Sequence, residues 1–97
     1  MKMFCASLVF AMSFNLCAQD AAKGAALYKQ CILCHGDKGD GNPAQKAPRI
    51  SGQYDWYVEK QLEDMKALRR KNPIMTPFVS KLSSADIKEL AAYISKL

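Results

Sequence analysis

The sequence predicts an all-α protein, and three observations support this fold class. Apolar residues recur at helical spacing in three segments, at about residues 20–33, 54–70 and 83–97. The first stretch between these segments is rich in glycine and proline and has no periodic apolar pattern, and the second contains Pro73 and Pro77. No segment shows the alternation of apolar and polar residues that is typical of a half-buried strand. We therefore expect three helices joined by two loops.

The N-terminal segment is predicted to be a signal peptide rather than part of the fold. Lys2 is followed by a short apolar run, and the small residue Ala18 suits cleavage before Gln19. The run is short for a membrane helix, which needs about 20 apolar residues. We expect a signal peptide at residues 1–18 and one domain at residues 19–97.

A signal peptide places the protein in the periplasm, free in solution after cleavage. An uncleaved leader that anchors the chain to the membrane is the alternative, and membrane association is expected only through such a leader. Lipid attachment at Cys17 is a weaker third reading, because Leu16 is bulkier than the small residue that usually precedes a lipidated cysteine.

The predicted domain is basic. Lys2 is the only charged residue among the first eighteen, so 13 Lys and Arg remain against nine Asp and Glu, a net charge of +4. These cations either solvate helix ends or form a docking surface for a partner protein with an acidic face. Nucleic acid is a poor candidate for an exported chain without a repeated basic and aromatic pattern. Possible members of a docking rim are Lys46, Arg70, Lys71 and Lys81.

Each predicted helix has its own signal. The first carries Gly24, Tyr28 and Cys31 at helical spacing. The third begins with Ser83 and has Asp86 three residues later, a variant of the capping box. The second is expected to end at Asn72 and Pro73, since a residue before proline avoids the α region. Its apolar stripe consists of Tyr54, Tyr57, Val58, Leu62, Met65 and Leu68.

Three short helices enclose little core, and the loops take up a large share of the domain. A chain of this size buries a modest fraction of its surface and benefits from an additional stabilising element. This observation by itself points to a large apolar cofactor in the middle of the fold.

The segment "CILCH" offers three chemistries: a zinc site, a redox-active pair of thiols, or covalent haem attachment. Structural zinc needs four Cys or His ligands, and the predicted domain has only Cys31, Cys34 and His35. A redox-active C-x-x-C is typical of the start of a helix after a strand, whereas this one closes a helix. C-x-x-C-H is the attachment motif of c-type haem, with one thioether from each cysteine and the histidine as an iron ligand.

A second axial ligand is expected from Met75. Met65, the other candidate, lies on the apolar stripe of the second helix and is predicted to fill the core. Met75 is held between Pro73 and Pro77 in a loop that we expect to be extended, far from His35 in sequence. Ligation by His and Met is the expected pattern of electron-transfer cytochromes c.

Four stretches together resemble the class I cytochromes c in order and spacing. They cover essentially all of residues 19–97, and the resemblance is closest to small bacterial forms, including those repeated in di-haem proteins. The stretches are "GAALYKQCILCHG", "APRISGQ", "YVEKQLEDMKALRR" and "NPIMTPFVSKLSSADIKELAAYISKL". The resemblance implies a cytochrome c fold, three main helices and loops wrapped round one covalently bound haem, with the first and last helices crossing.

The resemblance also assigns roles to single residues. Gly24 matches the small residue at the helix crossing, and Tyr28 and Tyr93 match the aromatic residues packed there. Pro48 matches the proline whose carbonyl accepts the Nδ1 proton of His35. Trp56 and Tyr54 could pack near a haem propionate or fill the core, and we expect Trp56 in the core. The chain departs from the family pattern at residues 67–68, where Ala and Leu replace a frequent glycine, so the resemblance does not define how the second helix ends.

The sequence thus predicts a periplasmic electron-transfer protein rather than an enzyme. It would carry single electrons on a His/Met-ligated haem c between respiratory redox proteins, such as an oxidase, a reductase or a peroxidase with an acidic face, and it would bind no small-molecule substrate. The alternative is a ligand-binding haem protein or a haem subunit of a larger redox enzyme, in which Met75 leaves the iron.

Overall fold

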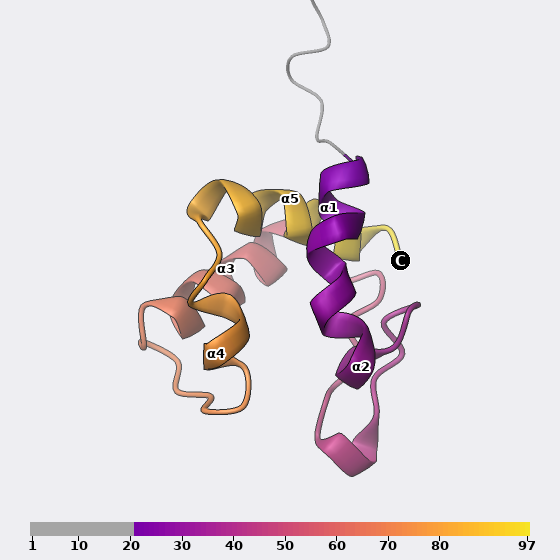
Figure 1. The fold of residues 1–97 in the computed structure, drawn as a ribbon, viewed down its shortest axis with the longest axis horizontal. Coiled ribbons are helices and arrows are strands. Elements are labelled where there is room, and N and C mark those ends of the chain that lie inside the picture. Colours follow the sequence, from indigo (N-terminus) through magenta and orange to yellow (C-terminus); the bar gives the residue numbers. More distant parts are fainter. Residues whose placement is uncertain (1–20) are drawn as a thin grey trace, which may run out of the picture.

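The computed structural model describes residues 21–97, which form an assembly of helices with long connecting loops (Figure 1). The predicted signal peptide, residues 1–18, lies outside the described residues. From residue 21 onward the chain forms no strand, only an isolated bridge between Asn42 and Ala47. The all-α fold class is therefore confirmed. In the same range, no helix has both the length and the apolarity to cross a membrane.

The first helical segment is a continuous run of α1 (Ala21–Tyr28), the 3-10 turn η2 (Lys29–Cys31) and α2 (Ile32–His35). It extends two residues beyond the predicted end and stops at Gly36, whose φ of 85° is rarely adopted by residues with a side chain. Both cysteines and the histidine of the C-x-x-C-H motif therefore lie in the last turns of one helical run.

The second predicted helix is α3 (Asp55–Lys66), and it is shorter than expected. The prediction that Asn72 and Pro73 end this helix is wrong. The chain leaves the helix at Leu68, which adopts a left-handed φ of 64°. The helix exit is therefore set several residues before the proline, at the position where the family pattern often has glycine.

A short helix, α4 (Thr76–Val79), replaces part of the loop that was expected to be extended. Pro77 lies within its first two positions, where the missing N–H of proline breaks no helical hydrogen bond. Met75 immediately precedes the helix as its N-terminal flanking residue. The side chain of Met75 is therefore carried by a turn that leads into a helix.

The last helix is α5 (Ser84–Ser95), and its predicted capping box is present. The Asp86 N–H donates to Ser83 Oγ at 3.0 Å, and the Ser83 N–H donates to an Asp86 carboxylate oxygen at 3.1 Å. These two bonds satisfy N–H groups that a helix start otherwise leaves without partners. They define the first turn of α5.

Helices α1 and α5 cross in the middle of the molecule (Figure 1). A Cβ on Gly24 would lie 2.7 Å from the Cβ of Tyr93, so a larger residue could not occupy the crossing without displacing α5. Next to it, the rings of Tyr28 and Tyr93 pack with their centroids 5.5 Å apart. The crossing thus has the small residue and the two aromatic residues that the resemblance implied.

The core is formed by one face each of α3 and α5 together with Tyr28, Val79 and Leu82. The prediction that Trp56 fills this core is wrong, because its side chain is 62% exposed and stacks on Tyr54, which is 67% exposed. Trp56 precedes the buried Val58 by two residues, and successive helical residues are about 100° apart. The two side chains therefore point to opposite sides of α3.

Candidate haem-binding site

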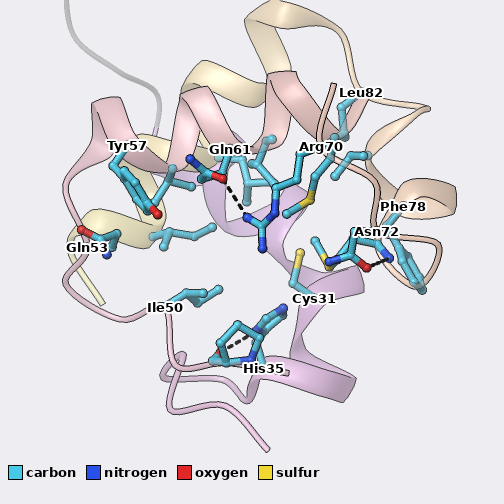
Figure 2. A pocket seen from close by; sticks show the side chains of 18 of the residues that line it. Cys31, His35, Ile50, Gln53, Tyr57, Gln61, Arg70, Asn72, Phe78 and Leu82 are labelled. Carbon is cyan, nitrogen blue, oxygen red and sulfur yellow. Dashed lines mark hydrogen bonds between the residues drawn. The ribbon is translucent and has the colours of Figure 1, made fainter. Parts of the chain in front are cut away.

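A cavity of about 510 Å³ lies between the helical run α1–α2 with its following loop and the segments α3 and α4. This size falls within the range of about 300–1,000 Å³ that is usual for cofactor sites. Figure 2 shows side chains from these segments converging on one space. Its apolar walls consist of Ile50, Val58, Leu62, Met65, Phe78, Val79, Leu82, Leu90 and Ile94.

Both cysteines of the motif reach this region, and they form no disulfide with each other. Cys31 lines the large cavity, and its sulfur points into it (Figure 2). Cys34 lines a smaller adjoining cavity of about 60 Å³ that Cys31 also borders. Burial, followed by the neighbouring Cys34, raises the pKa of the Cys31 thiol to about 11.

His35 ends α2 with its side chain only 6% exposed. Its Nδ1 lies 2.8 Å from the carbonyl oxygen of Pro48. A carbonyl only accepts hydrogen bonds, so this contact requires the proton on Nδ1 and leaves Nε2 as a free lone pair. An imidazole held in this way can bind a metal through Nε2 in a fixed ring orientation.

Gly41 brings the backbone that carries Pro48 close to the histidine. Its N–H donates to the His35 carbonyl at 2.8 Å. With φ at 84°, a Cβ at this position would lie 2.7 Å from backbone atoms of residues 47–49. Any larger residue would therefore push the Pro48 carbonyl away from the imidazole.

Met75 lies across the cavity on the segment between α3 and α4. It is half-buried and lines both the large and the small cavity, as His35 and Cys31 do. Met65 is buried and lines the large cavity from α3. The structure thus brings together the five residues that the sequence singled out, namely Cys31, Cys34, His35, Pro48 and Met75.

Comparison with known proteins identifies the family. The sequence model of the family described as "Cytochrome c" matches residues 21–97. The chain belongs to the cytochrome c family. Cytochrome c-553 of Helicobacter pylori is 38% identical over 96 residues, covering 99% of this chain and 97% of that protein.

Two longer proteins match over part of their length. The thiosulfate dehydrogenase electron acceptor of Thiomonas intermedia is 42% identical over 67 residues, or 69% of this chain and 31% of that protein. The crystal structure of reduced recombinant cytochrome c4 from Pseudomonas stutzeri superposes with a TM-score of 0.75 at 34% identity, covering 79% of this chain and 47% of that one. The chain thus spans about a third to a half of these relatives and nearly all of the c-553 relative.

Membership of the cytochrome c family confirms the predicted fold, three main helices without a sheet in residues 21–97. It also implies one covalently attached haem c as the cofactor and groups the chain with electron carriers rather than enzymes. Across this same range, no three Cys, His, Asp or Glu side chains gather where they could hold a metal ion by themselves.

The charges around the cavity fit a haem, which carries two carboxylates. Lys46, Arg49 and Arg70 line the cavity, and no Asp or Glu of the described chain does. The Arg70 guanidinium donates to the Gln61 side-chain oxygen at 2.7 Å and projects between the walls (Figure 2). Sequence reasoning placed Arg70 on an outer docking rim and missed Gln61. Nothing in the pattern indicated that residues nine positions apart would meet at the cavity.

Proposed function

We propose that this cytochrome c is a periplasmic mono-haem electron carrier. In this proposal Cys31 and Cys34 hold the haem through thioether bonds, and His35 and Met75 are the axial ligands of its iron. The bound iron supplies the chemistry by alternating between Fe(II) and Fe(III). The observation that carries the proposal is that a histidine with its proton directed away from the cavity and a methionine on another segment border the same apolar space.

The surroundings of the ligands support electron transfer over ligand binding. The single histidine of the chain is the one in the C-x-x-C-H motif. The polar cavity-lining groups from α3 onward are side chains such as Gln61, Arg70 and Asn72, which do not act as general bases at neutral pH. A soft thioether as sixth ligand favours Fe(II) and so raises the reduction potential. With His35 and Met75 as its ligands, a bound haem iron would have no open position for a substrate.

The ligand assignment is tested by spectra of the purified holoprotein. We expect a low-spin ferric spectrum with the near-infrared band of sulfur-to-iron charge transfer in the wild type. Met75→Ala should lose this band, become high-spin and bind carbon monoxide readily when reduced. Met65→Leu is the matched control, because Met65 also lines the cavity and leucine conserves its volume. A wild type that is high-spin and binds carbon monoxide would instead support the open-site alternative.

The thioether assignment has its own test. After denaturation, haem should stay with the wild-type polypeptide in mass spectrometry, and it should remain bound to Cys31→Ala or Cys34→Ala through the single remaining bond. Release of haem from the wild type on denaturation would contradict covalent attachment. The same spectrum gives the N-terminus, which we expect at Gln19 if residues 1–18 are a cleaved signal peptide.

We further propose that electrons pass through the cavity mouth near the cysteines to partners with acidic faces. Lys46 borders both cavities, and the exposed apolar Ile74 borders the smaller one beside Cys34. An apolar contact beside a cation suits a transient complex whose association is steered by charge. A thiosulfate-oxidising dehydrogenase is one donor to test, because a relative is described as the electron acceptor of such an enzyme.

Charge steering predicts that electron exchange with an acidic partner slows as ionic strength rises, because salt screens charges over about 10 Å at 0.1 M. Lys46→Gln should lower the rate at low salt and weaken the salt dependence. Lys88→Gln is the control, since Lys88 lies on α5 and borders neither cavity. Rates that are independent of salt would remove the steering proposal without affecting the ligand assignment.

A further inference from the structure

Asn72 is a polar residue at the cavity that the electron-carrier proposal does not use. It is half-buried and lines both the large and the small cavity, three residues before Met75. It belongs to neither α3 nor α4 but to the segment that joins them. A polar side chain in this position needs hydrogen-bond partners, and those partners show what it does.

The side-chain oxygen of Asn72 binds the backbone next to the methionine. It accepts from the Ile74 N–H at 3.2 Å and from the Met75 N–H at 3.1 Å. Asparagine favours such turns because its short side chain reaches the backbone two or three residues ahead. Two consecutive N–H groups of the methionine turn are therefore held by one side-chain atom.

The backbone carbonyl of Asn72 holds the same turn from its other side. It accepts from the Met75 N–H at 3.1 Å, from the Thr76 N–H at 2.9 Å and from the Thr76 hydroxyl at 2.8 Å. The backbone of residues 74–76 is thus bound to Asn72 at every N–H group. Pro73 lies between Asn72 and the residues that Asn72 binds, and its fixed φ further restricts the chain.

The orientation of the amide group follows from these partners. Both contacts of the side-chain oxygen are to N–H donors, so the amide nitrogen must occupy the other position. In Figure 2 that nitrogen is directed toward the interior of the pocket. The side-chain oxygen of Asn72 therefore faces the turn, and its side-chain nitrogen faces the cavity. Asn72 thus binds the turn and forms part of the cavity wall at the same time.

We propose that Asn72 is a positioning residue that clamps the turn of residues 74–76 and so holds the Met75 side chain at the cavity. The inference rests on the proposed role of Met75 as an axial ligand. A thioether is a weak ligand, so its lifetime on the iron depends on how rarely the segment that carries it opens. Loss of the clamp should therefore let external ligands compete more quickly, even when the folded protein is otherwise unchanged.

The chain offers a matched control in Asn42. It also precedes a proline, and its side-chain oxygen accepts from the Ala44 N–H at 3.0 Å, in the loop after the haem-binding motif. Asn42 lines neither cavity. Asn42→Ala therefore removes the same kind of turn without touching the segment that carries Met75.

The experiment measures how fast imidazole replaces the sulfur ligand of the ferric holoprotein, together with the sulfur-to-iron band and the free energy of unfolding. Asn72→Ala should raise the replacement rate about tenfold, which corresponds to about 1.4 kcal/mol. Asn72→Asp keeps both acceptor contacts and should stay within about threefold of the wild type. Asn42→Ala should leave the rate unchanged while still lowering stability. If Asn72→Ala gives no holoprotein, Asn72→Gln is measured instead, because its oxygen is displaced by one methylene, and it should also accelerate exchange.

The outcomes separate the two proposals. A wild type without the sulfur-to-iron band means that Met75 is not the ligand, and the proposed function fails at that point. A wild type with the band but equal exchange rates in the Asn72 and Asn42 variants means that Met75 ligates and Asn72 does not position it. Failure of Asn72→Asp to restore the slow rate would also overturn the clamp.

Discussion

Leu68 provides a sharp test of how α3 ends. Its φ of 64° lies in the left-handed region, where helices usually place glycine just after their last turn. The Leu68 N–H donates to the Met65 carbonyl at 3.2 Å, and the Arg69 N–H donates to the Asp64 carbonyl at 2.8 Å. These two bonds form a Schellman motif, which holds Leu68 in a conformation that residues with a side chain rarely adopt.

The energetic cost of leucine in this position follows from two contributions. The left-handed conformation costs a residue with a Cβ about 1–2 kcal/mol relative to glycine. The Leu68 side chain is 58% exposed, so its removal loses about 1 kcal/mol of apolar burial, less than the value for a fully buried leucine. The two contributions nearly cancel in Leu68→Gly, whereas Leu68→Ala loses burial and keeps the strained conformation.

We therefore expect Leu68→Gly to be more stable than Leu68→Ala by about 1 kcal/mol, the reverse of the order at an ordinary helical site. Guanidinium denaturation of the ferric holoproteins measures the difference, which corresponds to about 4–8 °C in melting temperature for a domain of this size. Ala26, exposed in α1, gives the control, because Ala26→Gly should lose about 1 kcal/mol. An alanine variant at position 68 as stable as the glycine variant would refute the reasoning.

Two further predictions concern charge. Arg70→Gln should lower the midpoint potential by a few tens of millivolts in a spectroelectrochemical titration, because a cation that lines the cavity favours the reduced haem. Lys71 does not line the cavity, so Lys71→Gln should shift the potential less. Equal shifts in the two variants would contradict this prediction. The hydrogen bond from the Ser83 backbone, followed by Lys23, lowers the pKa of Asp86 in the folded state. The ionised Asp86 therefore stabilises the fold above its unfolded pKa of about 4, and this stabilisation is lost as pH falls through the folded pKa. Asp86→Asn should therefore flatten the decline of stability below about pH 4 in urea titrations, and an unchanged decline would exclude Asp86 as its source.

The haem motif and the helices could be predicted because both depend on local sequence. Cys31, Cys34 and His35 lie close together in any helical turn, and Ser83 and Asp86 meet because a capping box spans only three residues. Periodicity identified the buried residues of α3, namely Val58, Leu62 and Met65, but the other three members of the predicted stripe, Tyr54, Tyr57 and Leu68, are exposed. These features depend on chain geometry that holds before any tertiary contact forms.

The tertiary structure decided the features that depend on distant partners. Trp56 is exposed because no segment within residues 21–97 covers its side of α3, and the sequence of α3 alone does not indicate which segments will pack against it. Arg70 faces Gln61 at the cavity because α3 ends early, and Asn72 binds the methionine turn because the chain reverses there. Local sequence thus determined the haem-attachment motif and the helices. Packing decided where α3 ends and which contacts the segment that carries Met75 makes. Both depend on hydrogen bonds that exist only in the folded chain and that offset local backbone strain.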